Sequence, residues 1–236
     1  MALLVYGDTN STLAGALAAA KMHLPVAHVE AGLRTHNKYS PYPEEINRRL
    51  ITAISDIHFA HTDLARKNLL KESVPNKKIF VTGNTSVDAL FMTLKNIRSG
   101  KAKIDKKWKK RLKNKKYLLV TAHRRENFGD KFENICNALL ELVKNNKNID
   151  VVYPVHPNPN VQNVAKIILS GHDRIHLIKP LDYVSFIDAM DNAYLILTDS
   201  GGIQEEAISL GKPTLVLRDT TERKEAIISG IVKLVG

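Results

Sequence analysis

The ten residues TDSGGIQEEA, 198 to 207, combine residue types that could bind a phosphate group. They follow the apolar run AYLILT, so the sequence predicts a strand that ends in a Ser-Gly-Gly turn and then a helix. Gly201 and Gly202 would let the backbone approach an anion, and the first N–H groups of the helix would point at the same place. Ser200 adds a hydroxyl donor, and Glu206, one turn later, could accept hydrogen bonds from sugar hydroxyls. This pattern predicts a nucleotide or sugar-phosphate site, although such a turn also occurs as plain packing.

Carboxylates follow the predicted strands of the N-terminal third of the chain. Asp8 and Glu30 each come directly after an apolar run, and Glu44 lies in the loop SPYPEEINRR. Neighbouring carboxylates in different protonation states can transfer protons at carbon or oxygen. Asp8 could instead cap the helix that follows it, and Glu44 or Glu45 would favour a helix dipole whatever else it does. Glu30 has no such alternative and is the strongest single candidate.

Cationic residues follow the strands of the C-terminal part. His123 comes after the run YLLVT, and Arg223 lies in DTTER. Together with the Ser-Gly-Gly turn they would suit a diphosphate. Arg124 and Arg125 directly follow His123 and would lower its pKa, which favours a neutral imidazole. His156, in YPVHPNPN, could equally be a structural loop residue.

Metal and redox chemistry are not expected. His58, His61, His172 and His176 show no ligand spacing with carboxylates or with Cys136, so the sequence predicts no metal site. A single cysteine cannot form an internal disulfide, which favours the reducing cytoplasm. We expect neither a signal peptide nor a membrane span.

The elements that must position these residues alternate between short apolar runs and amphipathic helical stretches, which is typical of parallel βαβ units. The predicted strands are 2–6, 24–29, 57–60, 78–82, 117–121, 151–155, 175–178, 193–198, 213–217 and 231–235. Ligands in open parallel sheets bind beyond the carboxyl ends of the strands, where the candidate residues stand. We predict two doubly wound domains, 1–84 and 85–236. The first offers only four strands and is expected to be incomplete.

The net charge of +11 raises the question of nucleic acid. The excess is local, because 12 Lys or Arg residues stand between Lys95 and Lys116 against one acid, Asp105. Such a run is typical of a solvated helix and linker, and its affinity for nucleic acid would be non-specific and sensitive to salt. We therefore expect no specific nucleic-acid partner.

Nine motifs in order carry a resemblance that covers essentially the whole chain. They are GDTNST, HVEAGLRT, SPYPEEINRR, TGNTSVDAL, TAHRREN, YPVHPNPNV, LTDSGGIQEEA, LGKPTLVLRDTTERKEA and the closing strand. The chain resembles the non-hydrolysing UDP-N-acetylglucosamine 2-epimerases of bacteria and archaea. The resemblance implies two Rossmann-like domains in a glycosyltransferase-B arrangement, a cytoplasmic homodimer and no cofactor. It also implies interconversion of UDP-N-acetylglucosamine and UDP-N-acetylmannosamine, in which UDP is eliminated to give 2-acetamidoglucal and then re-added.

The resemblance also implies roles for residues that match the family's motifs. The implied catalytic residues are Asp8, Glu30, Glu44 and His123. The implied substrate-binding residues are Asp8, Glu30, His123, Leu181, Phe186, Ser200, Gly201, Gly202, Glu206 and Arg223. In this assignment Leu181 and Phe186 form the wall beside the uracil, and Glu206 accepts the ribose hydroxyls.

The chain departs from the family pattern at both ends. The glycine-rich loop with an Arg and a Lys that opens family members is not matched, nor are the helices beyond their last strand, so the resemblance implies a partial chain. Three alternatives stay open: a hydrolysing 2-epimerase that releases N-acetylmannosamine and UDP, an inactive UDP-binding module, and a retaining glycosyltransferase. The motifs HRREN and DTTER favour the non-hydrolysing epimerase.

Overall fold

The computed structural model describes residues 1–112, 116–223, 227 and 230–236, and its contacts divide the chain into two compact units. Unit 1 comprises Met1–Thr85 and Thr220–Glu222, and unit 2 comprises Ser86–Asp219 and Arg223–Gly236. The first division falls one residue after the boundary predicted between 84 and 85. The return of Thr220–Glu222 to unit 1 is not anticipated by the sequence.

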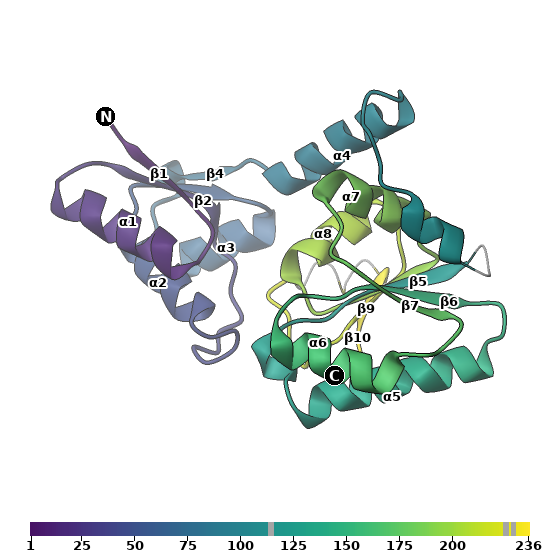
Figure 1. Cartoon of the computed structure of the whole chain (residues 1–236). Helices are drawn as coiled ribbons and strands as arrows, with labels where there is room; N and C mark the ends of the chain where they lie inside the picture. The colour runs from purple at the N-terminus through teal and green to yellow at the C-terminus, as the bar shows by residue number, and fades with distance from the viewer. Residues whose placement is uncertain (113–115, 224–226, 228–229) are drawn as a thin grey trace. The chain divides into compact units, whose positions relative to one another are not determined.

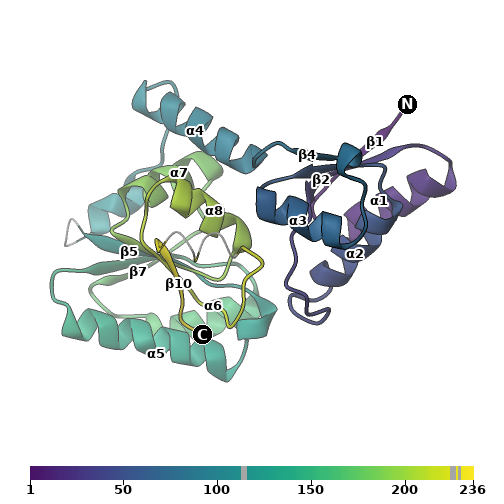
Figure 2. The ribbon, with the colours of Figure 1, turned by 180° about the vertical axis from the view of Figure 1, so that it is seen from behind.

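Unit 1 is built on a four-stranded parallel sheet in the order β1-β2-β3-β4. The α-helices between the strands lie against one face of this sheet (Figures 1 and 2), as right-handed crossovers require when each strand is added beside the last. The elements are β1 Leu3–Tyr6, α1 Asn10–Lys21, β2 Val26–Ala31, α2 Glu44–Ile54, β3 Ile57–Ala60, α3 Asp63–Lys71 and β4 Ile79–Val81.

Threonine side chains start two helices of unit 1. The hydroxyl of Thr9 accepts a hydrogen bond from the backbone N–H of Thr12 at 3.2 Å and so caps α1. Thr62 caps α3 in the same way, through the backbone N–H of Ala65 at 3.1 Å. The interpretation of Asp8 as the cap of the first helix is therefore wrong, because Thr9 holds that position.

Strand pairing gives the two faces of the unit 1 sheet different surroundings. The row of Val5, His28, His58 and Ile79 lies on the helix-covered face and is buried. The opposite face, called the open face here, carries the side chains of Leu4, Tyr6, Ala27, Val29, Ile57, Phe59 and Phe80. Leu4 is 63% exposed, Tyr6 48% and Phe80 49%. The open face is therefore an apolar sheet surface in contact with solvent.

Unit 2 is built on a six-stranded parallel sheet in the order β10-β9-β8-β5-β6-β7. The chain starts in the middle at β5, moves outward through β6 and β7, and returns to β8 before moving outward the other way. The order therefore reverses between β5 and β8, which is the topological switch point of a doubly wound sheet. The elements are α4 Thr85–Arg98, β5 Tyr117–Thr121, α5 Asp130–Asn145, β6 Asp150–Pro154, α6 Pro159–Leu169, β7 Ile175–Ile178, α7 Tyr183–Asn192, β8 Leu195–Thr198, α8 Gly201–Ser209, β9 Thr214–Val216 and β10 Val232–Leu234.

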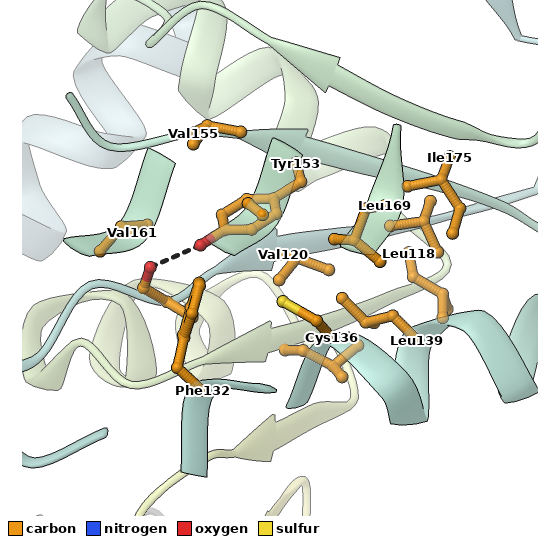
Figure 3. Packing of buried hydrophobic residues seen from close by; sticks show 14 of the residues in the cluster. Leu118, Val120, Phe132, Cys136, Leu139, Tyr153, Val155, Val161, Leu169 and Ile175 are labelled. Atoms are coloured by element: carbon orange, nitrogen blue, oxygen red, sulfur yellow. Dashed lines mark hydrogen bonds between the residues drawn. The ribbon is translucent and has the colours of Figure 1, made fainter. Parts of the chain in front are cut away.

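Helices cover both faces of the unit 2 sheet, with α5 and α6 on one face and α7 and α8 on the other (Figures 1 and 2). Figure 3 shows the cluster beneath α5 and α6, where Phe132, Cys136 and Leu139 pack against strand residues. The hydroxyl of Tyr153 lies in this cluster and donates to the backbone oxygen of Ala122 at 2.6 Å. Burial raises the pKa of the Cys136 thiol to about 12, so this cysteine is a packing residue.

The lysine-rich segment 95–116 is exposed over most of its described length, as expected, and residues 113–115 lie outside the described part. Trp108 is buried within it and meets the ring of Tyr117 edge-on at 5.5 Å between centroids. The ammonium group of Lys109 binds the carboxylate of Asp188 at 2.6 Å. The segment is thus anchored on unit 2 at these side chains.

The α/β class with two parallel sheets is confirmed. Each of the ten segments predicted as strands overlaps a strand of the structure. Among the helices that the structure describes, none is long and apolar enough to cross a membrane.

Candidate functional site

Two of the predicted site segments meet at the switch point of unit 2. His123 follows β5, the turn of Ser200 and Gly201 follows β8, and these strands are hydrogen-bonded neighbours. The hydroxyls of Thr121 and Thr198 are joined at 2.7 Å just before the two strands end. A switch point is where doubly wound sheets open a crevice for ligands. The topology thus brings together segments that are far apart in the sequence.

The Ser-Gly-Gly turn leads directly into α8, as predicted. Ser200 is the residue before the helix, and its side chain makes no capping hydrogen bond there. A Cβ added to Gly202 would meet no other atom within 4 Å. The plain-packing alternative therefore fails for Gly202, because nothing in the described structure presses against it. The helix N-terminus instead offers backbone N–H groups beside open space, which suits an anion.

His123 is held between two partners within unit 2. Its Nδ1 lies 3.5 Å from Oδ1 of Asp199, and its ring stacks on that of His156 with centroids 5.2 Å apart. Burial lowers the pKa of His123 first of all, and His156 and Arg124 lower it further against the opposing effect of Asp199. The lowered pKa agrees with the sequence prediction. Its cause is mainly desolvation rather than the adjacent arginines.

The two acidic residues of α8 have different partners. The guanidinium of Arg223 forms a short hydrogen bond to the carboxylate of Glu205. Glu206 is hydrogen-bonded to Tyr183, and burial together with the neighbouring Glu205 raises its pKa to about 7. Near neutral pH Glu206 therefore exists partly as a neutral carboxyl group, which can both donate and accept a hydrogen bond. Such a group suits a hydroxyl-bearing ligand.

The predicted apolar wall lies beside this region of unit 2. Leu181 precedes α7 and Phe186 lies within it, and both are partly buried against the core cluster between the sheet and α7. The hydrogen bond from Tyr183 to Glu206 joins α7 to α8. Partly exposed apolar side chains at the start of α7 could cover one face of a planar base.

Asp8 is held by the buried side chain of Arg48 in unit 1. Arg48 Nε donates to Oδ2 of Asp8 at 2.9 Å, and its Nη2 lies 2.7 Å from the same oxygen. The amide of Asn47 donates to the backbone oxygen of Asp8 at 2.8 Å. Arg48 also lies 3.7 Å from the carboxylate of Glu222. The first turn after β1 is therefore fixed by α2.

Glu30 lies inside β2 and not after it, which corrects the strand boundary predicted from the sequence. The pairing of β2 with β3 shifts at a β-bulge between Val29 and Ala31, and Glu30 adopts a positive φ of 71°. This left-handed conformation costs a non-glycine residue about 1–3 kcal/mol. A bulge re-aims the side chain that it carries. One carboxylate oxygen of Glu30 comes within 3.1 Å of where a Cβ on Gly7 would lie, directly before Asp8.

Glu44 and Glu45, which the sequence does not distinguish, differ in the structure. Glu45 is fully buried, and its carboxylate accepts the backbone N–H groups of Thr35 at 3.0 Å and His36 at 3.1 Å. Glu44 is the first residue of α2 and is partly exposed. It stands one helical turn before Arg48, the partner of Asp8. Glu45 is thus occupied in holding a loop, which leaves Glu44 the better candidate for chemistry.

The structure adds residues that sequence reasoning missed. Asp199 is fully buried and binds the loop after β5, and its signal was its position directly after β8 at the switch point. Arg48 joins the acidic groups of unit 1, and its signal was its spacing of three residues from Glu45 on a helix. Tyr183 partners Glu206 and carried no sequence signal.

Comparison with known proteins decides the family. The family model described as UDP-N-acetylglucosamine 2-epimerase matches residues 2–236. The chain belongs to the UDP-N-acetylglucosamine 2-epimerase family. A UDP-N-acetylglucosamine 2-epimerase of Yersinia pestis is 54% identical over 237 residues, which cover 99% of this chain and 63% of that protein. One from Escherichia coli K12 is 50% identical, with the same coverage. The resemblance read from the motifs is confirmed at the level of the family.

Solved structures of family members share the fold. A co-structure of S. aureus MnaA with UDP has a TM-score of 0.92 at 48% identity. The match covers 99% of this chain and 62% of the MnaA chain. The UDP-GlcNAc 2-epimerase of Neisseria meningitidis bound to UDP-GlcNAc has a TM-score of 0.91 at 49% identity, with 99% and 63% covered. The chain therefore spans somewhat less than two thirds of the length of these relatives.

Proposed function

We propose that this protein interconverts UDP-N-acetylglucosamine and UDP-N-acetylmannosamine by reversible inversion at C2, without a redox cofactor. The observation that carries the proposal is the meeting of His123 and the Ser200–Gly202 turn at a switch point. It occurs in a chain of the 2-epimerase family, whose relatives have been solved with UDP and with UDP-GlcNAc. Fold alone would not support an activity, because unrelated functions share this architecture.

The nucleotide is proposed to bind unit 2. The diphosphate would lie at the N-terminus of α8, where Ser200 and the backbone N–H groups of the two glycines supply donors. His123 would add a further donor from the loop after β5. Glu206 would bind the ribose hydroxyls, because the competing carboxylate of Glu205 is paired with Arg223. Arg223 would add positive charge near the diphosphate, and Leu181 and Phe186 would pack against the uracil.

The chemistry at C2 is proposed to use the carboxylates Asp8, Glu30 and Glu44. A base removes the C2 proton while the bond from C1 to the UDP oxygen breaks, and its electrons leave with UDP. The product pair is 2-acetamidoglucal and UDP. Protonation of C2 on the opposite face and return of the UDP oxygen to C1 complete the inversion. This route consumes no oxidant, because the proton and the leaving group both return.

Proton NMR in D2O tests the reaction. The protein is incubated with UDP-N-acetylglucosamine, and we expect UDP-N-acetylmannosamine to form with deuterium at C2, since the abstracted proton exchanges with solvent. Accumulation of free N-acetylmannosamine and UDP would show the hydrolysing reaction instead, in which water replaces UDP in the second step. Turnover with an acceptor sugar would indicate a glycosyltransferase.

UDP binding without turnover is the second candidate function. It is favoured by the placement of His123 and the Ser200–Gly202 turn after two neighbouring strands of the same unit, so that the proposed nucleotide site needs no residue of unit 1. Isothermal calorimetry with UDP, run beside the turnover assay, separates the two candidates. Heat of binding without either sugar product would support the binding module and contradict an epimerase made of this chain alone.

The catalytic carboxylates are tested by Glu30→Gln. We expect turnover to fall by at least about 100-fold, the typical contribution of a positioned acid or base, while the affinity for UDP is unchanged. Glu141→Gln, on the exposed side of α5, is the matched control and should change neither quantity. Retained turnover in Glu30→Gln would remove Glu30 from the catalytic set.

The homodimer implied by the family resemblance stays a prediction. Size-exclusion chromatography with light scattering would give the mass in solution directly. A monomeric mass across the working concentration range would contradict it.

A further inference from the structure

Asp199 has an unusual environment for a carboxylate. It is fully buried at the end of β8, directly before the Ser-Gly-Gly turn. Its Oδ2 accepts hydrogen bonds from the backbone N–H groups of His123 at 2.7 Å and Arg124 at 2.8 Å. The side-chain amide of Asn127 donates to the same oxygen at 3.1 Å. One carboxylate oxygen therefore ties the loop after β5 to the end of β8.

The other oxygen of Asp199 is the informative one. Oδ1 is buried and has no hydrogen-bond partner within the described part of the chain, and Nδ1 of His123 lies 3.5 Å from it. A buried carboxylate oxygen without a donor is costly. An N–H on Nδ1 of His123 would satisfy it after a small shortening, and such hydrogen bonds are often long before a ligand is bound. The arrangement favours a proton on Nδ1.

His156 holds the His123 ring from the other side. The two rings are stacked with 14° between their planes. His156 Nδ1 accepts a hydrogen bond from the backbone N–H of Asn158 at 3.1 Å, so the neutral form of His156 carries its proton on Nε2. The stack limits rotation of the His123 ring, and the ring is oriented with Nδ1 toward the carboxylate of Asp199. The two imidazoles are therefore expected in opposite tautomers.

We propose that Asp199 is a positioning residue that holds neutral His123 as the Nδ1–H tautomer, so that Nε2 is the nitrogen presented to a ligand. The inference rests on the proposed function only in taking that ligand to be the diphosphate of a nucleotide sugar. The same carboxylate fixes the backbone of His123 next to the Ser200–Gly202 turn. One buried group thus sets both the place and the protonation pattern of the imidazole. Asp199 itself touches neither sugar nor phosphate.

The tautomer is measured directly by long-range proton–nitrogen NMR of the histidine rings of this chain. The spectrum is recorded at about pH 8, above the ordinary histidine pKa of about 6.5, and His123→Ala identifies the His123 signals. We expect a protonated Nδ1 and an unprotonated Nε2. The opposite pattern in the unsubstituted chain would overturn the proposal, and His123→Ala is needed only to assign the signals.

Asp199→Asn then tests the cause. The asparagine oxygen can keep accepting the backbone N–H groups, which places its NH2 group toward Nδ1 of His123. Nδ1 must then accept, and we expect the tautomer to invert. Asp150→Asn is the matched control, because Asp150 is also buried and pairs with His176 Nε2 at 2.9 Å. It should leave the His123 signals unchanged. An unchanged tautomer in Asp199→Asn would overturn the proposal.

Calorimetry with UDP shows whether Asp199 acts through His123. We expect Asp199→Asn to weaken UDP binding about tenfold, as expected for the loss of one hydrogen bond to a charged group. In a His123→Ala background the same change should have almost no further effect. Two independent, additive losses would contradict a positioning role. If the unsubstituted chain does not bind UDP, the proposed function fails while the tautomer result still decides the role of Asp199.

Discussion

Helices cover both faces of the sheet in unit 2 but only one face in unit 1. In unit 2 helices cover both faces of a six-stranded parallel sheet, and its central strands β5 and β6 are almost entirely buried. In unit 1 the helices lie against one face, and the open face exposes large apolar side chains. Parallel sheets are normally covered on both faces. The difference teaches that unit 2 has a complete core of its own, whereas unit 1 keeps a surface that favours burial against something else.

The two units also differ in the charges that they gather. Unit 1 places the carboxylates of Asp8, Glu45 and Glu222 around the single guanidinium of Arg48. Unit 2 collects imidazoles, Arg223 and a helix N-terminus around the switch point. Carboxylates suit proton transfer, and the second set suits an anion. The same architecture therefore presents two kinds of chemistry.

The largest expected effect concerns the complete core. Phe132→Ala in unit 2 should lower the free energy of unfolding by about 3–5 kcal/mol, because it empties a fully packed site under α5. Urea unfolding followed by the fluorescence of Trp108, the single tryptophan of the chain, reports on this unit.

Phe80→Ala on the open face is the matched control, with amide hydrogen exchange of the strands β1 to β4 to follow unit 1. We expect a loss below about 1 kcal/mol, since Phe80 is half exposed. Equal losses of stability in the two variants would mean that the open face is packed as tightly as the core of unit 2. That result would contradict the difference in packing between the two units.

The second effect is a dependence of stability on pH that belongs to unit 1. Burial lowers the pKa of His28 to about 4, although its Nε2 bonds the backbone oxygen of Gly7 at 2.8 Å. The unfolded chain binds the proton more readily, so stability is complete above about pH 6.5 and falls as the pH drops toward 4. The shift corresponds to about 3 kcal/mol.

Urea unfolding at a series of pH values measures this loss, and His28→Gln should remove much of the slope. Burial also lowers the pKa of His58, which adds to the effect in the same direction. A flat profile for unit 1 between pH 6.5 and 4 would contradict the buried neutral state of His28.

A smaller effect separates binding from packing in unit 2. Gly202→Ala should leave stability unchanged or slightly higher, because the added methyl group meets open space and alanine favours a helix. If a phosphate approaches the backbone there, the methyl group should weaken UDP binding about tenfold, or about 1.4 kcal/mol. Calorimetry and urea unfolding on the same variant measure both quantities.

Gly211→Ala is the control for that variant. Gly211 has a positive φ of 65°, so alanine there should cost stability without changing the intrinsic affinity for UDP. Undiminished UDP affinity in Gly202→Ala would contradict the proposed position of the phosphate at the start of α8.

The smallest effect concerns the open face. Phe80→Lys should change the free energy of unfolding by about 0.5 kcal/mol or less, and it should reduce association between copies at high concentration. Sedimentation velocity over a range of concentrations measures the association. The reciprocal test replaces an exposed lysine of unit 2 by an apolar residue. Lys144→Phe should increase association between copies at high concentration.

The fold was largely readable from the sequence because parallel strands buried on both faces form short continuous apolar runs. All ten strand segments were placed, and the basic segment around Trp108 was correctly assigned as an exposed connection. The bulge in β2 was not readable, because Glu30 continues the strand in a conformation that no local pattern encodes. The return of Thr220–Glu222 to unit 1 depends on Arg48 and Glu222, which are far apart in the sequence.

The candidate site divides in the same way. Residues at strand ends, such as Asp8, His123 and Ser200, could be selected because the rule for parallel sheets fixes where ligands bind. The choice between two adjacent acidic residues could not be made from the sequence, because it depends on which of their carboxylates already has a partner in the folded chain. Only the structure pairs Glu205 with Arg223 and Glu45 with the backbone of Thr35.

The left-handed backbone of Glu30 has a consequence for anyone who engineers this protein. A glycine would occupy that conformation with little strain, so a screen for heat resistance alone would tend to select Glu30→Gly. The selected protein would be more stable to heat, and if the proposed role of Glu30 holds, it would also be inactive. Thermostabilisation by consensus or by computation should therefore treat position 30 as fixed, and accept its strain as part of the working protein.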